Sequence, residues 1–313
     1  MYLGSLYLYA YWFLRPLIKW FLRKTTKLCE LQRVCYGEPS GASRTLGVEF
    51  SLTHSKTPQI QEVIRYLNER SENLEFIGKH TKTNIEFAVV TVLRVKKIHP
   101  TIHNQFIKSF GRTVEQIWGY KQLNVEVEEL RRTAYDSSNP QHEEMLLGLW
   151  QRLNPDTRLE ARVTKQWQDI GFQGDDPKTD FRGMGMLGLH NLYYFSDHYQ
   201  KASQHVLLHS LHPVNGYAFA IVGINLTSLA YHLLQDGAAK SHIFNFAKGS
   251  PVMRHFHQLY CYLFCEFDRF WFDSKPKDIM DFARIRDDFE TSIRTILANP
   301  HTVFRINMLV DTI

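Results

Sequence analysis

Residues 167–195 read WQDIGFQGDDPKTDFRGMGMLGLHNLYYF, and the character of the sequence changes halfway through them. The first half, from Gly171 to Gly185, holds four glycines, three aspartates, one proline and a single arginine, Arg182. Such a composition disfavours regular helices and strands and is typical of a shaped loop. From Met184 onward, apolar residues recur at helical spacing, which predicts a buried helix. We therefore expect Arg182 to lie where a loop enters a helix.

The simplest role for the charged residues of this loop is structural. Asp180 is a residue type that caps helices, and the helix is expected to begin at Thr179-Asp180. Arg182 is placed to pair with Asp175 or Asp176. A surface pair of this kind contributes only ~0–1 kcal/mol to stability.

A longer pattern of residues gives the loop a second interpretation. Its members are Trp167, Gly171-Phe172-Gln173, Asp176-Pro177, Thr179-Asp180-Phe181-Arg182-Gly183, Gly185, Leu187-Gly188-Leu189 and Asn191-Leu192. This run resembles the signature of the engulfment-and-cell-motility (ELMO) domain. Four further segments are similar to the small ELMO-domain-containing (ELMOD) proteins: CELQRVCY (29–36), AYDSSNPQHEEMLLGLW (134–150), GYAFAIVGINLTSLAY (216–231) and FHQLYCYLFCEFDRFWF (256–272).

The resemblance implies a function as well as a fold. Small ELMOD proteins carry an arginine in the Thr-Asp-Phe-Arg-Gly motif, which the large scaffold members generally lack, and they act as GTPase-activating proteins for Arf and Arf-like GTPases. The resemblance thus implies that Arg182 is an arginine finger, supplied in trans to a GTP-bound partner without any cofactor. A planar, permanently charged guanidinium of this kind accelerates GTP hydrolysis by about 10³–10⁵. The chain has no glycine-rich loop ending in Lys-Ser or Lys-Thr, which is consistent with an activator that binds no nucleotide itself.

We expect the other residues of the loop either to contact the GTPase or to hold the loop in shape. Those expected to contact the GTPase are Gln173, Asp176, Thr179, Asp180, Gly183 and Gly185, with Gln173 a second candidate for orienting water. Those expected to be architectural are Trp167, Gly171, Phe172, Pro177 and Phe181.

Two other classes of function fit parts of the same loop. Asp175-Asp176 and Asp180 resemble the acidic helix motif of all-α isoprenoid synthases. Pro177 would disrupt the continuous helix that this motif requires, and no second acidic cluster completes a magnesium site. A scaffold, by contrast, would use the loop to dock a GTPase or its regulator without accelerating hydrolysis.

Length and composition limit the class of protein. The 313 residues allow one large domain with an extension, and a formal net charge of +5 gives little support for nucleic-acid binding. The four cysteines predict free thiols in a reducing, intracellular compartment. Cys261 and Cys265, with His257 one turn earlier, are expected to be core residues of a helix and not metal ligands.

The start of the chain is apolar and aromatic and is followed by a row of cations. Residues 1–14 are uncharged, and basic residues then recur every four positions from Arg15 to Lys27, on one helical stripe. The apolar run is shorter than the ~20 residues of a spanning helix, and its aromatic content suits the water–lipid interface. We expect a helix that binds anionic endomembranes peripherally, or one docked on the protein's own core. The residues expected to contact the membrane are Trp12, Arg15, Lys19, Trp20, Arg23 and Lys27.

Helical spacing and turn residues predict an all-α, multi-helix protein. We expect a hydrophobic-basic segment at 1–35, a helical extension at 36–134 that packs on the core, an ELMO domain at 135–300 and a tail at 301–313. Residues 36–55 are rich in glycine, serine and threonine and predict an irregular connector. Helices are expected at 58–70, 84–98, 101–118 and 120–132, from Asn139-Pro140, from a Thr157–Glu160 capping box to Gly171, at 216–234 in the core, at 253–272, and from Pro276 to Leu297.

Overall fold

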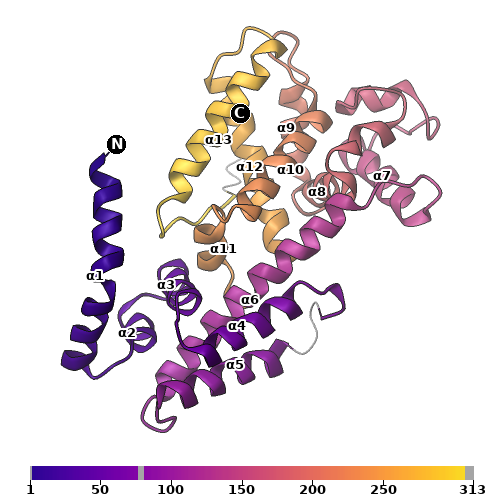
Figure 1. Cartoon of the computed structure of the whole chain (residues 1–313). Helices are drawn as coiled ribbons and strands as arrows, with labels where there is room; N and C mark the ends of the chain where they lie inside the picture. Colours follow the sequence, from indigo (N-terminus) through magenta and orange to yellow (C-terminus); the bar gives the residue numbers. More distant parts are fainter. Residues whose placement is uncertain (1, 77–80, 307–313) are drawn as a thin grey trace. The chain divides into compact units, whose positions relative to one another are not determined.

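Helices make up the regular structure of this chain. The computed structural model describes the backbone of residues 2–76 and 81–306 and, from residue 13 onward, their side chains. Within these residues the elements are α-helices and short 3-10 helices, without a strand (Figure 1). The predicted all-α class is therefore confirmed.

The chain divides into two compact units. The first comprises residues 1–118 with 248–250, and the second comprises residues 119–247 with 251–313. The division falls inside α6 (Asn104–Arg132), where the sequence predicted two separate helices. That prediction is wrong, because an interior glycine such as Gly119 costs a helix only ~1 kcal/mol. The residues on either side of Gly119, Trp118 and Tyr120, are both buried and stabilise the continuous helix.

The first unit packs its helices around an apolar core. Its elements are α1 (Tyr2–Thr26), α2 (Glu30–Gly37), α3 (Ala42–Thr53), α4 (Pro58–Ser71), η1 (Leu74–Phe76), α5 (Thr81–Lys96) and the first part of α6. The core includes Leu31, Val48, Val92, Phe106 and Phe110. The rings of Phe106 and Phe110 stack with their centroids 5.3 Å apart. Burial of such side chains, at ~1.5–3 kcal/mol each, is the main source of stability in this unit.

Helix α3 occupies the stretch that the sequence predicted to be a connector. Thr45 and Val48 are buried on its packed face. A Cβ added at Gly47 would lie 3.0 Å from Cγ1 of Val34 in α2. The small residues of this stretch therefore allow close helix packing, which is why their composition was misread as a linker.

The second unit is organised around α8 (Gly185–His198). Its other elements are the end of α6, α7 (Pro140–Leu153), η2 (Lys165–Ile170), η3 (Pro177–Arg182), α9 (Gln200–Ser210), α10 (Phe219–Gln235), α11 (Lys240–Phe246), α12 (Met253–Asp273), η4 (Ile279–Asp281) and α13 (Phe282–Leu297). Helix α8 packs against α7, α9, α10 and α12, and η3 leads into it (Figure 1). Leu187, Leu192 and Phe195, whose spacing predicted this helix, are fully buried.

Several helices of the second unit lie where the sequence predicted them. Asn139 caps α7 by accepting a hydrogen bond from the Gln141 amide at 2.9 Å, and Pro140 takes the first helical position. Helices α10 and α12 match the patterns at 216–234 and 253–272. Helix α13 ends at Leu297 as predicted but begins at Phe282 and not after Pro276, since the short η4 comes first. Among the described residues, none of the helices combines the length and apolar character that crossing a membrane requires.

The helix predicted after Pro155 does not form over residues 157–164. Only the short η2 follows, with Thr164 as its cap. Two indole groups donate hydrogen bonds to backbone carbonyls of this stretch. Trp150 Nε1 donates to Thr157 O at 2.8 Å, and Trp167 Nε1 donates to Arg162 O at 2.9 Å. These side-chain-to-backbone hydrogen bonds satisfy backbone groups that a helix would have paired internally, and so they override the capping-box pattern.

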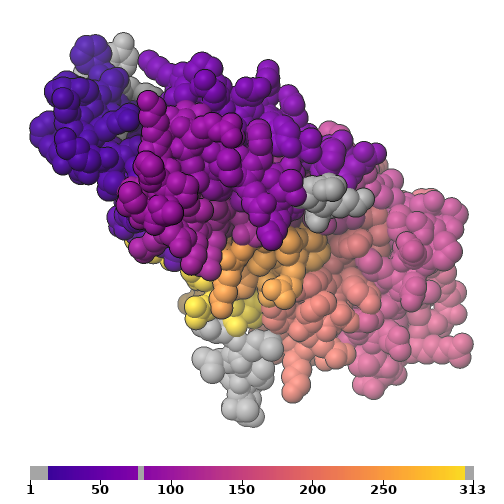
Figure 2. Space-filling view, turned by 90° about the horizontal axis from the view of Figure 1, so that it is seen from below, coloured from indigo at the N-terminus to yellow at the C-terminus, as the bar shows by residue number. Residues whose placement is uncertain are grey.

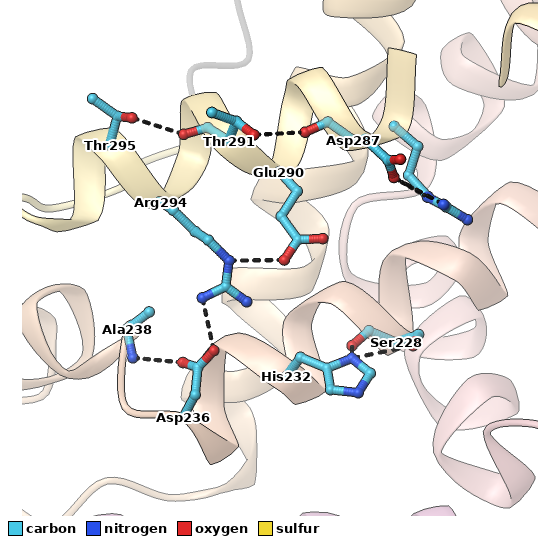
Figure 3. A network of polar contacts seen from close by, with 10 residues as sticks. Ser228, His232, Asp236, Ala238, Asp287, Glu290, Thr291, Arg294 and Thr295 are labelled. Carbon is cyan, nitrogen blue, oxygen red and sulfur yellow. Dashed lines mark hydrogen bonds and ion pairs between the residues drawn. The ribbon is translucent and has the colours of Figure 1, made fainter. Parts of the chain in front are cut away.

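A polar network joins α13 to the end of α10 (Figure 3). Arg294 donates from Nε to Glu290 Oε1 and from Nη1 to Asp236 Oδ2, both at 2.7 Å. The other oxygen of Asp236 accepts the Ala238 amide at 2.9 Å, which closes the turn after α10. All three charged side chains are about a third exposed or more, so we expect the network to contribute no more than about 1 kcal/mol.

Candidate functional site

The loop that carries Arg182 begins at a position that only glycine fits. Gly171 has a φ of +83°. A Cβ at this position would lie 2.3 Å from Phe219 N and 2.7 Å from Ala218 C. The Gly171 carbonyl accepts a hydrogen bond from the Ile221 amide at 3.2 Å. The loop is therefore anchored against the first turn of α10.

Asp176 and Arg162 hold the middle of the loop. Asp176 Oδ1 accepts hydrogen bonds from the Lys178 amide and from Arg162 Nη1, both at 3.0 Å. Arg162 also donates from Nε to Glu143 Oε2 in α7 at 2.6 Å. One arginine thus ties the loop to a neighbouring helix through two carboxylates.

The chain enters its central helix in two steps. Asp176 caps η3, in which Pro177 is the first residue and is buried. Helix α8 begins only at Gly185. The prediction that one helix starts at Thr179-Asp180, with Asp180 as its cap, is therefore wrong. Asp176 takes that role because it stands directly before Pro177, whose fixed φ favours a first helical position.

Asp180 closes the loop on itself. Its Oδ2 accepts a hydrogen bond from the Gln173 amide at 2.9 Å, seven residues earlier. Burial raises the pKa of the Asp180 carboxyl, while the Gln173 amide and the positive charge of Arg182 oppose that rise. The carboxylate therefore links the two arms of the loop and lies within the electrostatic influence of Arg182.

Five aromatic side chains support the loop from beneath. They follow the order Trp150, Trp167, Phe172, Phe181 and Tyr135, with consecutive ring centroids 5.6, 5.8, 5.6 and 5.7 Å apart. Trp167, Phe172 and Phe181 are buried, in the positions where the sequence placed architectural residues. Aromatic pairs of this kind contribute ~0.5–1.5 kcal/mol each beyond burial. These five side chains form a packed layer beneath the loop, which we call the aromatic floor.

Two glycines after Arg182 have opposite environments. Gly185 has a φ of +51°, and a Cβ there would lie 2.4 Å from Arg131 O and 2.5 Å from Thr133 O. Apart from its own backbone and its two chain neighbours, Gly183 has no heavy atom of the described residues within 4 Å of its Cβ position. Gly185 is therefore required by the fold, whereas Gly183 leaves open space beside Arg182.

Residues of the loop and of α10 line one cavity of about 430 Å³. The loop contributes Gln173, Gly174, Thr179, Asp180, Arg182 and Gly183, and α10 contributes Ile221, Ile224 and Asn225. The structure thus gathers five predicted site residues, namely Gln173, Thr179, Asp180, Arg182 and Gly183. Asp176 and Gly185 lie outside the lining and hold the loop in shape.

Sequence reasoning missed the α10 wall of the cavity and the residue Arg162. The pattern at 216–234 identified a core helix, but an almost uniformly apolar helix does not reveal which face meets the loop. Asn225 was the available signal, because a polar side chain in such a helix marks a face that is not wholly apolar. Arg162 gave no local signal, since its partners Glu143 and Asp176 lie 19 and 14 residues away.

Arg182 is exposed and available to a partner. Among the residues that the structure describes, its guanidinium makes no ion pair and no side-chain hydrogen bond. The carboxylate of Asp176, which was a candidate partner from the sequence, is bound by Arg162 instead. A structural salt bridge therefore does not account for the side chain of Arg182.

The predicted membrane-contacting residues lie in different environments. Arg15 is buried, with Nη2 3.4 Å from Glu30 Oε1, and Lys19 Nζ lies 2.5 Å from Glu30 Oε2. The expected stripe of four outward cations is therefore wrong at Arg15, because its charge is used inside the first unit. Three of the predicted residues are exposed, namely Trp20, Arg23 and Lys27. The side chain of Trp12 lies outside the described residues.

Comparison with known proteins assigns this helical protein and its loop to a family. Residues 125–286 match the ELMO/CED-12 family. The chain belongs to that family, as the loop motif predicted. It is 45% identical to ELMO domain-containing protein 1 of Homo sapiens over 313 residues, covering 92% of this chain and 90% of that protein.

Two further relatives also cover nearly the whole chain. ELMO domain-containing protein 2 of Mus musculus is 45% identical over 294 residues, covering 94% of this chain and 95% of that protein. ELMO domain-containing protein B of Dictyostelium discoideum is 34% identical over 290 residues, covering 90% and 94%. No solved structure matches the chain.

Proposed function

We propose that this protein is a GTPase-activating protein for Arf or Arf-like small GTPases and that Arg182 is its arginine finger. The observation that supports this most directly is the state of Arg182, which lines a cavity, is exposed and makes no ion pair among the described residues. Membership of the ELMO/CED-12 family and the Thr-Asp-Phe-Arg-Gly motif support the same proposal.

The chemistry of GTP hydrolysis explains why an available arginine matters. Negative charge spreads over the phosphate oxygens in the transition state, and a guanidinium donated by a partner stabilises it with two parallel hydrogen bonds. Arg182 ends a short helix whose preceding residue, Phe181, is buried in the aromatic floor. The backbone that carries the finger is therefore ordered before a GTPase binds, which reduces the entropy lost on binding.

The two walls of the cavity suit a protein partner with mixed polarity. Asp180 and Thr179 supply polar groups on the loop, and Ile221 and Ile224 supply an apolar wall on α10. We expect the switch regions of the GTPase to lie between these walls. The open space at Gly183 lets the GTPase backbone approach Arg182 closely.

Single-turnover GTP hydrolysis by a panel of Arf and Arf-like GTPases tests the proposal. The wild-type protein is compared with Arg182→Ala, Arg182→Lys and the control Lys178→Ala, which removes an exposed cation of η3 outside the cavity lining. We expect both Arg182 variants to keep the melting temperature and most GTPase binding but to lose about 10³–10⁵ of the stimulation. The control should behave as the wild type.

Complex formation with GDP and aluminium fluoride separates catalysis from docking. A catalytic arginine tightens association with this transition-state mimic for the wild type and the Lys178→Ala control, and not for Arg182→Ala. Equal stimulation by wild type and both Arg182 variants would refute the finger. Binding without stimulation by the wild type would instead identify a scaffold.

We also propose that α1 associates peripherally with an anionic membrane surface. Six apolar side chains of its described part are exposed, and the four most exposed of them are Phe13, Leu17, Trp20 and Phe21. Such side chains bind the interfacial region of a bilayer and are costly to leave in water. Flotation with phosphatidylserine vesicles tests the proposal, since a variant with serine at all four positions should remain at the bottom of the gradient.

A further inference from the structure

The first unit contains a cavity of about 450 Å³ that the proposed function does not use. Its walls come from α1, the start of α2, the end of α3, the turn that leads into α4, and the end of α5. Six basic side chains line it: Arg15, Lys19, Arg23, Arg33, Lys56 and Lys96. Glu30 is the single carboxylate in the lining.

Glu30 balances only part of this positive charge. Its carboxylate binds Arg15 and Lys19, and Ser51 Oγ donates to it at 2.7 Å. Although burial opposes it, the hydrogen bonds from Lys19 and Ser51 lower the pKa of Glu30, so the group is ionised at neutral pH. The negative charge of Glu30 is thus already paired with Arg15 and Lys19 of α1.

Within the part of the chain that the structure describes, the remaining cations lack a carboxylate partner. Arg33 donates to the Leu28 carbonyl at 2.7 Å, and within the described residues Arg23, Lys56 and Lys96 make no ion pair. Like charges held around a concave surface repel one another and focus a positive potential into the space between them. An anion bound there would relieve this repulsion.

Neutral donors and the size of the cavity favour a phosphate-bearing group. Ser55 and Thr57 supply hydroxyls to the lining, and Thr57 precedes α4 without capping it through its side chain. The ends of α3 and α5 and the start of α4 all contribute residues to the lining. Dipoles of helix C-termini and of a helix N-terminus act on an anion in opposite directions, so the charge argument rests on the basic side chains. A volume of about 450 Å³ lies in the range of small-molecule sites.

The setting of the cavity points to a lipid as the source of the anion. Pro16 of α1 lines the cavity, and its sequence neighbour Leu17 is exposed, as are Trp20 and Phe21 on the same helix. Figure 2 shows the indigo atoms at the start of the described chain gathered at one end of the first unit. Apolar side chains beside a basic cavity match a bilayer, where acyl chains lie next to charged headgroups.

We infer that this cavity binds a phosphate-bearing polyanion and that the anion is the headgroup of a phosphorylated membrane lipid. The anion site does not depend on GTPase activation. The choice of a lipid over a soluble phosphate rests on the proposed membrane association of α1. Bound headgroup would bridge α1 to the ends of α3 and α5 and so hold the helix at the membrane in one orientation.

Binding experiments on the full chain test the cavity. The probes are vesicles of phosphatidylcholine with phosphatidylinositol bisphosphate, vesicles of equal charge with phosphatidylserine, and soluble inositol trisphosphate. The cavity variant is Arg23→Ala/Lys56→Ala/Lys96→Ala. The matched control removes three exposed cations of the same unit outside the lining, as Lys82→Ala/Arg94→Ala/Lys108→Ala.

We expect the wild type to prefer phosphoinositide vesicles over phosphatidylserine vesicles of equal charge. The cavity variant should bind them about a hundredfold more weakly, since each basic residue near an anionic surface contributes about a factor of five. The control should keep the wild-type affinity. Melting temperatures must agree across the variants, which is expected because none of the six substituted side chains is buried.

The outcomes separate the source of the anion from the existence of the site. If soluble inositol trisphosphate binds and the cavity variant loses it, the site stands. Displacement of the protein from vesicles by that probe then assigns the same cavity to the lipid headgroup. Equal losses in the cavity variant and the control would overturn the site. No preference for phosphoinositide over phosphatidylserine vesicles would overturn its assignment to a lipid headgroup. None of these readouts involves GTP hydrolysis, so failure here leaves the proposed function untouched.

Discussion

Alanine substitutions at Gly183 and Gly185 should change stability in opposite directions. At Gly185 the φ of +51° is strained for alanine by ~1–2 kcal/mol. The added Cβ would lie 2.4 Å from Arg131 O and 2.5 Å from Thr133 O, and these are backbone atoms that cannot rotate away. Movement of Thr133 O would weaken its 2.8 Å hydrogen bond from the Met186 amide, at a cost of ~1 kcal/mol. We expect Gly185→Ala to lower the free energy of unfolding by about 3 kcal/mol.

Gly183 offers the matched comparison. It has φ −80° and ψ −36°, a right-handed helical conformation that alanine adopts readily. Apart from its own backbone and its two chain neighbours, no heavy atom of the described residues lies within 4 Å of the added Cβ. Gly183→Ala should therefore raise the free energy of unfolding by ~0.4–1 kcal/mol, because alanine restricts the unfolded chain.

Urea unfolding followed by tryptophan fluorescence measures both changes, since Trp150 and Trp167 lie in the floor beneath the loop. Equal destabilisation by the two substitutions would refute the assignment of an open Gly183 and a closed Gly185. Stimulated hydrolysis provides a second readout. If the GTPase backbone approaches Arg182 through the space at Gly183, the stabilised Gly183→Ala protein should be a poorer activator than the wild type. Unchanged stimulation would show that this space is not used.

Three further substitutions test other parts of the second unit. Phe181→Ala should remove ~3–5 kcal/mol of stability, because its ring is buried between two others of the aromatic floor; an unchanged melting temperature would show that the ring is not part of the core. Burial lowers the pKa of His257 to about 3, against ~6.5 in the unfolded chain. The contribution of neutral His257 to the free energy of unfolding is therefore complete above pH 6.5 and is lost as the pH falls toward 3. The stability gap between wild type and His257→Gln should therefore narrow by about 2 kcal/mol from pH 6.5 to 5, and a constant gap would contradict the assignment. Arg294→Ala should cost no more than about 1 kcal/mol, and a loss of several would mean that the network at Asp236 is more than a surface contact.

The sequence predicted helices best where one face is strongly apolar. The spacing of Leu187, Leu192 and Phe195 was sufficient for α8, and Asn139-Pro140 was sufficient for the start of α7. Both signals are local, because a buried stripe and a cap each depend on residues within a few positions. The loop motif also placed Arg182 correctly at the junction before α8.

The failures arose where specific side-chain contacts, and not propensity or composition, decide local structure. The capping-box spacing of Thr157 and Glu160 suggested a helix, but the indoles of Trp150 and Trp167 bind backbone carbonyls there. The small residues near Gly47 suggested a linker, but they permit close packing of two helices. Propensity and turn composition contain no information about such partners, so these elements required the structure.

In the candidate site, too, the residues of a local motif could be predicted, whereas those contributed by another helix could not. Residues of one contiguous loop could be named from their motif, including Gln173, Asp180 and Arg182. The opposite wall belongs to a helix that begins more than thirty residues later, and Ile221 and Ile224 look like any core residues in the sequence. Arg15 was misplaced for a related reason, since its partner Glu30 lies on another helix.

The two constrained glycines, Gly171 and Gly185, have a consequence for how this loop can diversify. Each end of the loop is fastened to backbone that tolerates no added carbon atom, and the carboxylates of Asp176 and Asp180 hold the chain between these ends. The path of the loop therefore does not depend on its exposed side chains. Outward positions such as Gln173 and Thr179 are exposed and can be exchanged without altering that path. If the loop binds a GTPase as proposed, partner preference could therefore be selected in a library at little risk to folding. Randomising these two positions while retaining both glycines should yield mostly folded proteins that differ in which GTPase they favour.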